Sequence, residues 1–114
     1  MHTDCLSSML PIQDALEVIS GKWKLLIITS VSAGNNRFRN IQGSIPKLSS
    51  KVLAKELKEL EAHQLIKHTV SEQSSGIMEY VLLPYAETLS EVLRALRKWG
   101  KSHRNKVIKG QLAA

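Results

Sequence analysis

The sequence predicts a mainly α-helical single domain that carries one small β-hairpin. Apolar residues recur with a helical period over most of the chain, and the period changes to two only between residues 65 and 83. Glycine and proline fall between these segments, where they end helices or form turns. Of the 114 residues, 43% are hydrophobic, which is enough for one core and argues against disorder. We therefore treat residues 1–114 as one domain.

Two helices are expected in the first third of the chain. Pro11 suits the first turn of a helix, where its missing N–H is not needed, and Gly21 ends that helix. A second helix is expected over residues 22–33; it is apolar on several sides, and Gly34 is well placed to cap it. Upstream of Pro11, residues 1–10 are expected to form a flexible arm.

A short helix, a turn and a further helix come next. The segment RFRNIQGSI predicts a short helix that stops near Gly43, and Pro46 prevents the helix from continuing through Ile45. Ser49 is a natural N-cap for the helix that follows. That helix has one apolar and one cationic face. The two faces consist of Leu53, Leu57 and Leu60, and of Lys51, Lys55 and Lys58.

The last third of the chain predicts a hairpin and a long helix. Residues 65–72 and 77–83 have the period of strands and are joined by a short loop, QSSG. The last helix begins at Pro84 and runs past Lys101, and residues 105–114 are expected to be a frayed basic tail. A short helix, a turn, a second helix and a hairpin, in this order, form a winged helix-turn-helix.

The charge distribution indicates a polyanionic partner. The formal net charge is +6, no acidic residue lies between Glu17 and Glu56, and none follows Glu91. Lysine and arginine residues gather in these two acid-free blocks. Nucleic acid is favoured over a membrane as the partner. The alternative is a solvated basic surface without a partner.

Other classes of protein find little support in the sequence. The one cysteine, Cys5, allows no internal disulfide and fits a reducing cytoplasm. Apolar runs such as residues 25–28 are too short for a membrane span, and the first residues do not resemble a signal peptide. The four histidines lack the spacing of metal ligands. No phosphate loop or nucleophile motif is present, so we expect neither a cofactor nor an enzyme.

Several motifs in this order are similar to those of one family. SGKWKLLII, RFRNI, LSSKVLAKELKELEA, MEY and WG, spread over residues 11–100, resemble the HxlR family of bacterial transcription regulators, relatives of the MarR group. The resemblance implies a homodimer that binds operator DNA. Whether a small-molecule effector is a further partner, and which one, the sequence leaves open. The resemblance also implies that the first and last helices form the dimer interface. The apolar residues expected there are Ile12, Leu16, Leu89, Val92, Leu93, Leu96 and Trp99.

The chain departs from the family pattern at several positions. Leu10 stands where the family usually has a cysteine, which argues against redox sensing through that position. The one cysteine present, Cys5, is either a redox switch itself or an incidental thiol on the arm. Gln64 stands where a glycine often ends the recognition helix, and must take the helix-ending conformation. Asn36 replaces a frequent basic residue, and Pro84 replaces a hydroxyl cap.

The helix after Ser49 is the expected recognition helix. Its leucines would anchor it while its small, cationic N-terminal end enters the major groove. The expected DNA contacts are Ser49, Ser50, Lys51, Lys55 and Lys58 on this helix, Arg37, Arg39 and Lys47 before it, and Gln73 and Ser74 at the wing tip. Two alternatives stay open: the lysines form a solvated face, or the domain is a protein-interaction module that has lost DNA binding.

Overall fold

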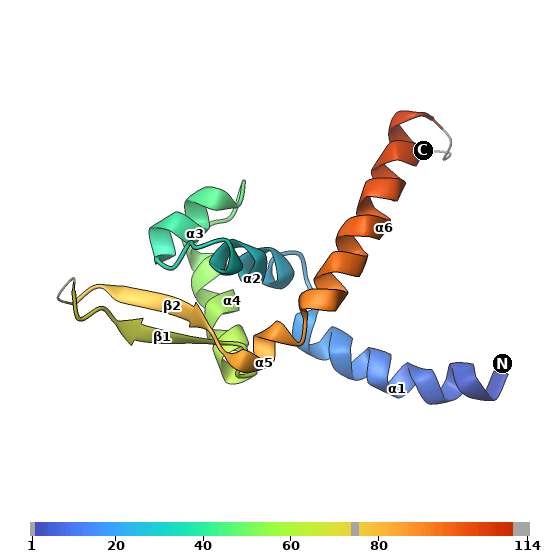
Figure 1. Cartoon of the computed structure of the whole chain (residues 1–114), viewed down its shortest axis with the longest axis horizontal. Coiled ribbons are helices and arrows are strands. Elements are labelled where there is room, and N and C mark those ends of the chain that lie inside the picture. Colours follow the sequence, from blue (N-terminus) through green and yellow to red (C-terminus); the bar gives the residue numbers. More distant parts are fainter. Residues whose placement is uncertain (1, 74–75, 111–114) are drawn as a thin grey trace.

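The computed structural model describes residues 2–73 and 76–110 (Figure 1). Its fold is mainly helical with one antiparallel hairpin, which confirms the predicted class. The elements are α1 (His2–Ile19), α2 (Lys24–Ser32), α3 (Phe38–Ser44), α4 (Ser50–Ala62), β1 (Ile66–Val70), β2 (Met78–Leu82), α5 (Pro84–Glu87) and α6 (Ser90–Ile108).

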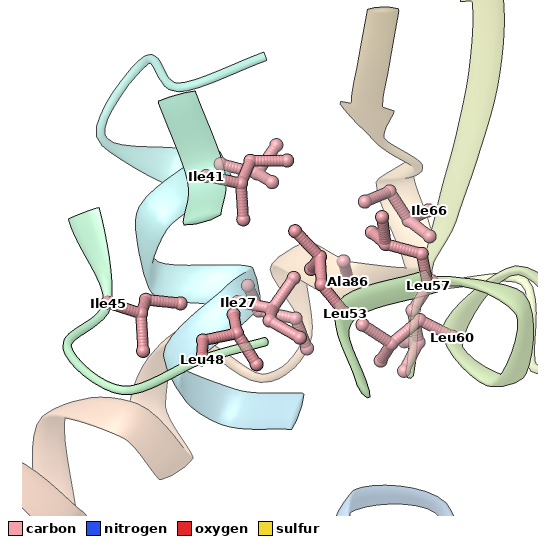
Figure 2. Close-up of a cluster of buried hydrophobic side chains, with 12 residues drawn as sticks. Ile27, Ile41, Ile45, Leu48, Leu53, Leu57, Leu60, Ile66 and Ala86 are labelled. Atoms are coloured by element: carbon pink, nitrogen blue, oxygen red, sulfur yellow. The ribbon is translucent and has the colours of Figure 1, made fainter. Parts of the chain in front are cut away.

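One apolar core joins α2, α3, α4, α5 and the root of the hairpin (Figure 2). The core is aliphatic, because aromatic residues make up only 4% of the chain. Its fully buried members include Ile27 of α2, Ile41 of α3 and Leu53 of α4. Ile66 closes the core from the hairpin side. The four helices and the root of the hairpin are thus held as one body, and the outer part of the β1–β2 hairpin, the wing, projects from it.

The hairpin pairs β1 with β2 in a register from Ile66 opposite Leu82 to Val70 opposite Met78. Alternation along a strand places Ile66 and Val70 on one face, so the buried root and the exposed outer end of β1 lie on the same side. The outer edge of β2 is also held, because the Tyr80 N–H donates to the Asn36 carbonyl at 2.7 Å. The segment before α3 therefore supports the wing.

The chain ends differ from what the sequence predicted. α1 begins at His2 and contains Pro11 in its interior, so residues 2–10 are helical where a flexible arm was expected. Met9 lies three and seven residues before Ile12 and Leu16, so the helical spacing of apolar residues continues upstream of the proline. At the other end α6 continues to Ile108, inside the segment expected to fray.

The last helix is divided in two, where one continuous helix was expected. α5 ends at Glu87 and α6 starts at Ser90. Between them the Thr88 and Leu89 N–H groups donate to the carbonyls three residues earlier, at 3.2 and 3.0 Å. The Thr88 hydroxyl also donates to the Tyr85 carbonyl at 2.6 Å. These tighter bonds interrupt the regular α-helical pattern and redirect the chain.

The molecule is more extended than a compact domain of this length. Its radius of gyration is 16.9 Å, whereas a compact chain of this size has about 13 Å. Figure 1 shows the cause: α1 and α6 point away from the body on the side opposite the wing. Among the described residues, no helix is long and apolar enough to cross a membrane.

Candidate nucleic-acid interface

The helix α4 has the two faces that the sequence predicted. Ser49 is its N-cap, and the Ser49 hydroxyl oxygen accepts a hydrogen bond from the Val52 N–H at 3.2 Å. The three leucines of the helix are buried and its three lysines are exposed. Ser49 and Ser50 are exposed as well, so the outer side of the first turn faces solvent. The start of α4 is open to a partner.

The turn between α3 and α4 has an unusual backbone. Lys47 lies at φ +67°, the left-handed region that glycine normally occupies. It follows Pro46, and the Leu48 N–H points back to the Ile45 carbonyl at 3.4 Å, as in a type II turn. The exposed Lys47 side chain therefore projects from a well-defined turn beside the start of α4.

A glutamine that the sequence analysis did not single out braces this turn. The Gln42 amide nitrogen donates to the Leu48 carbonyl at 3.2 Å, and its amide oxygen accepts from the Ser50 hydroxyl at 3.1 Å. One side chain of α3 thus holds both the turn and the first residue of α4. Ser50, expected to face DNA, also has this role within the protein.

A buried lysine fixes the rotation of α4 about its axis. Lys24 of α2 is 7% exposed, and its Nζ lies 2.6 Å from Glu56 Oε2 and 2.5 Å from Glu59 Oε2. Burial alone would lower the pKa of Lys24, but its hydrogen bonds to Glu56 and Glu59 outweigh this and raise it. The hydrogen bond from Lys24 in turn lowers the pKa of Glu59. Lys24 lies in the stretch without acidic residues between Glu17 and Glu56, but because it is buried it does not contribute to the basic surface of the molecule.

The C-terminal end of α4 is tied to the wing. The Glu61 carboxylate accepts the His68 N–H of β1 at 2.7 Å and lies 2.5 Å from the His68 ring nitrogen Nδ1. Gln64 has φ +61°, which confirms the expected helix-ending conformation. The Leu65 N–H then donates to the Leu60 carbonyl at 3.0 Å, as in a Schellman motif. α4 is thus fixed at both ends.

The remaining predicted contacts lie at the start of α3 and on the wing. Arg37 is partly buried and Arg39 is exposed, and both border an open cleft against the start of β2. Gln73 is exposed near the wing tip. Ser74 lies outside the described residues. The structure therefore brings the two arginines next to the wing, a proximity that the sequence analysis did not foresee.

The expected dimer residues divide into two groups. Leu89 and Leu93 are partly buried and pack against the core of their own chain. The others are exposed: the exposed fractions are 56% for Ile12, 52% for Leu16, 40% for Val92, 48% for Leu96 and 67% for Trp99. The Trp99 ring stacks on His103 of the same helix, with ring centres 5.1 Å apart.

Comparison with known proteins identifies relatives along most of the chain. The family described as HxlR-like helix-turn-helix matches residues 18–108. YtcD of Bacillus subtilis (strain 168), described as an uncharacterised HTH-type transcriptional regulator, is 35% identical over 96 residues, which are 84% of this chain and 76% of YtcD.

Solved structures agree with the sequence comparison. The crystal structure of the HTH-type regulator YtcD has a TM-score of 0.75 at 35% identity, covering 82% of this chain and 96% of that one. Quinone-bound YodB from B. subtilis has a TM-score of 0.67 at 27% identity, covering 81% and 97% of the two chains. This chain therefore belongs to the HxlR-like helix-turn-helix family and is a helix-turn-helix transcriptional regulator, not an enzyme.

Proposed function

We propose that this regulator binds operator DNA as a homodimer, each protomer inserting α4 into the major groove. The observation that carries the proposal is the exposed cationic start of α4 on a helix whose opposite face is locked into the core. Ser50 and Lys51 are exposed, whereas Leu53 has no exposed surface. A recognition helix needs this combination, because it must be held rigidly and still reach base edges with its first turns.

Each charged group has a part in this arrangement. Lys51 and Lys55 project from the first two turns into or across the groove, and Lys58 reaches backbone phosphate or solvent. Arg39 and Lys47 contact phosphates beside the groove, which adds affinity but little sequence choice. None of the α4 side chains is an arginine, the residue best suited to bidentate guanine recognition. Sequence preference therefore rests on serine, lysine and DNA shape.

The terminal helices support the homodimer. Both α1 and α6 expose large apolar side chains, and an open groove of about 480 Å³ runs between α2 and α6. Lys22 and Arg97 line this groove, whereas α1 carries Asp14 and Glu17 and no lysine or arginine. The apolar and acidic α1 of a second protomer therefore complements the groove. A two-fold axis would place the recognition helices about 34 Å apart on a pseudo-palindromic site.

An effector site fits at the root of these helices. A pocket of about 280 Å³ lies between α1, α5 and α6, with apolar walls that include Val18, Leu65 and Leu89. Tyr85 and Asp14 supply polar groups at its wall. YodB has been solved with a quinone bound. We propose that a small, largely apolar effector occupies this pocket and thereby changes the angle between the terminal helices and the DNA-binding body.

The DNA proposal is tested by the salt dependence of binding. Selection from a random DNA pool with the full chain provides a binding sequence, and affinity is then measured over a range of salt concentrations. Changing Lys51 and Lys55 to Ala is expected to weaken binding and to reduce the salt slope by about one unit per lost phosphate contact. Lys98→Ala, on the exposed surface of α6, is the matched control.

Two results would contradict the proposal. An unchanged salt slope in the Lys51 and Lys55 variant would exclude these lysines from the DNA contact. A chain that binds no DNA at low salt but retains a protein partner would instead support the interaction-module alternative.

A further inference from the structure

An open cleft separates the start of α3 from the start of β2. Its volume is about 670 Å³, and its lining residues are Arg37, Phe38, Arg39, Asn40, Ile77 and Met78. α3 packs beside β2 in this region (Figure 1). Ile77 is 39% exposed and Met78 46% exposed, although both are large apolar side chains. The cleft thus combines a cationic wall from α3 with an apolar wall from the wing.

The charged side chains that line the cleft are both cationic. None of the six lining residues carries a carboxylate, and two of them are arginines. The nearest acidic residue along β2 is Glu79, whose side chain points to the opposite face of the strand from that of Met78. The Asn36 amide nitrogen donates to the Glu79 carboxylate at 2.7 Å, and Glu79 is not among the residues that line the cleft. An anionic group that enters the cleft therefore meets no carboxylate among its lining residues.

We propose that a deoxyribose–phosphate segment of the DNA backbone occupies this cleft. Its phosphate lies against the two arginines, and its sugar lies against Ile77 and Met78. A nucleic-acid backbone presents this alternation of an anionic and a less polar group. A peptide strand added to the edge of β2 is disfavoured as the occupant, because the Tyr80 N–H on that edge is already bonded to the Asn36 carbonyl. The inference rests on the proposed DNA binding and adds Asn40, Ile77 and Met78 to its contacts.

The consequence is that the wing contacts DNA through its apolar base. Lysine and arginine are absent from its described tip residues, 71–73 and 76, so electrostatic attraction there is weak. Van der Waals contact between these apolar side chains and the sugars requires no charge. Such contacts change affinity without releasing counterions, which separates them experimentally from phosphate contacts.

The test uses the full chain and a random-sequence duplex of about 30 base pairs at low salt, because a backbone contact does not depend on sequence. The double change Ile77→Ser and Met78→Ser is expected to weaken binding about tenfold while leaving the salt slope unchanged, since no cation is removed. Val70→Ser is the matched control. Val70 pairs with Met78 across the hairpin and is 60% exposed, but does not line the cleft, so its change should leave affinity unaltered.

A second variant tests the cleft by adding a positive charge to its apolar wall. Ile77→Lys is expected to steepen the salt slope by about one unit, because the new ammonium group would lie beside the bound phosphate. If both variants bind as the wild-type chain does, the cleft inference is overturned while the proposed function stands. If the wild-type chain binds no duplex at low salt, both are overturned. Circular dichroism on each variant confirms that the hairpin is retained.

Discussion

At the scale of single residues, Lys24 has the clearest effect on how α4 is presented. Its two carboxylate partners come from one face of α4, 32 and 35 residues further along the chain. They lie between the buried leucine face and the exposed lysine face of α4, so the ion pairs help to keep the lysines turned outward. Removing the lysine would leave Glu56, whose side chain is only 12% exposed, without its cation.

We expect Lys24→Met to lower the free energy of unfolding by about 2 kcal/mol, because breaking a largely buried ion pair leaves an uncompensated charge. Urea denaturation at neutral pH measures the change. Lys58→Met on the exposed side of α4 is the control and should stay within about 0.5 kcal/mol of the wild-type chain. Equal stabilities for the two variants would show that the ion pair does not hold α4.

The same ion pairs predict how stability depends on pH. The pKa of Glu59 is lowered from its ordinary value of 4.5, so its contribution is present above pH 4.5 and disappears as the pH falls through the lower folded value. The pKa of Lys24 is raised from 10.5, so its contribution is present below pH 10.5 and disappears as the pH rises through the higher folded value.

Urea midpoints measured from pH 7 down to pH 3 should therefore fall for the wild-type chain. They should fall less for Lys24→Met, which has already lost the interaction. Parallel pH profiles for the two proteins would contradict this assignment.

Local signals were readable in the sequence, and distant pairings were not. Ser49 was predicted as an N-cap because a cap is decided within four residues, and the structure confirms it. Lys24 looked like any other cation of its acid-free block, because its acidic partners are remote in the sequence. Gln42 had no local pattern that pointed to its contacts with Leu48 and Ser50.

At the scale of elements, two left-handed residues shape the ends of the helix-turn-helix. Lys47 ends the turn before α4 and Gln64 ends α4 itself, at φ +67° and +61°. Neither is glycine, so each carries a backbone cost of about 1 kcal/mol. Sequence comparison with the family predicted this for Gln64, but the conformation of Lys47 followed only from the turn that Pro46 imposes.

We expect Gln64→Gly to raise the free energy of unfolding by up to about 1 kcal/mol, since glycine adopts this conformation without strain although it also loosens the unfolded chain. Thermal denaturation measures the change. Lys47→Gly should have a similar effect on stability but should weaken DNA binding, because it also removes a cation from the proposed interface. A loss of stability in Gln64→Gly would mean that its side chain contributes more than its backbone costs.

The division of the last helix shows a limit of periodicity. Leu89, Val92, Leu93 and Leu96 keep a helical spacing, so the sequence predicted one helix from Pro84. The break depends on the hydrogen bonds from the Thr88 and Leu89 N–H groups to the carbonyls three residues earlier, which the spacing of the apolar residues does not reveal. Pro84 was correctly identified as a start signal, and it begins the short helix α5.

At the scale of the whole molecule, the extended shape leaves apolar surfaces of α1 and α6 uncovered in the single chain. A stripe in a sequence shows which residues avoid water but not which surface covers them. Leu89 and Leu93 turn toward their own core, whereas Leu16, Leu96 and Trp99 remain exposed in the single chain. α1 and α6 both expose several large apolar side chains, as surfaces that bind a partner do. A second copy is the simplest partner of matching chemistry.

Dimerisation is therefore the prediction that concerns the entire chain. At micromolar concentration, light scattering should give the mass of two chains for the wild-type protein. Changing Leu16 and Leu96 to Glu should give the mass of one, because two charges would be buried at the seam without partners. Both side chains are about half exposed in the single chain, so the core should remain folded.

Val70→Glu, an exposed apolar position on the wing, is the control and should leave the mass at two chains. The monomeric variant should also bind a two-half-site duplex far more weakly than the wild-type dimer, because each recognition helix would then bind independently. If the wild-type chain scattered as a single chain, the apolar stripes would need another partner, and the half-site spacing of about 34 Å would lose its basis.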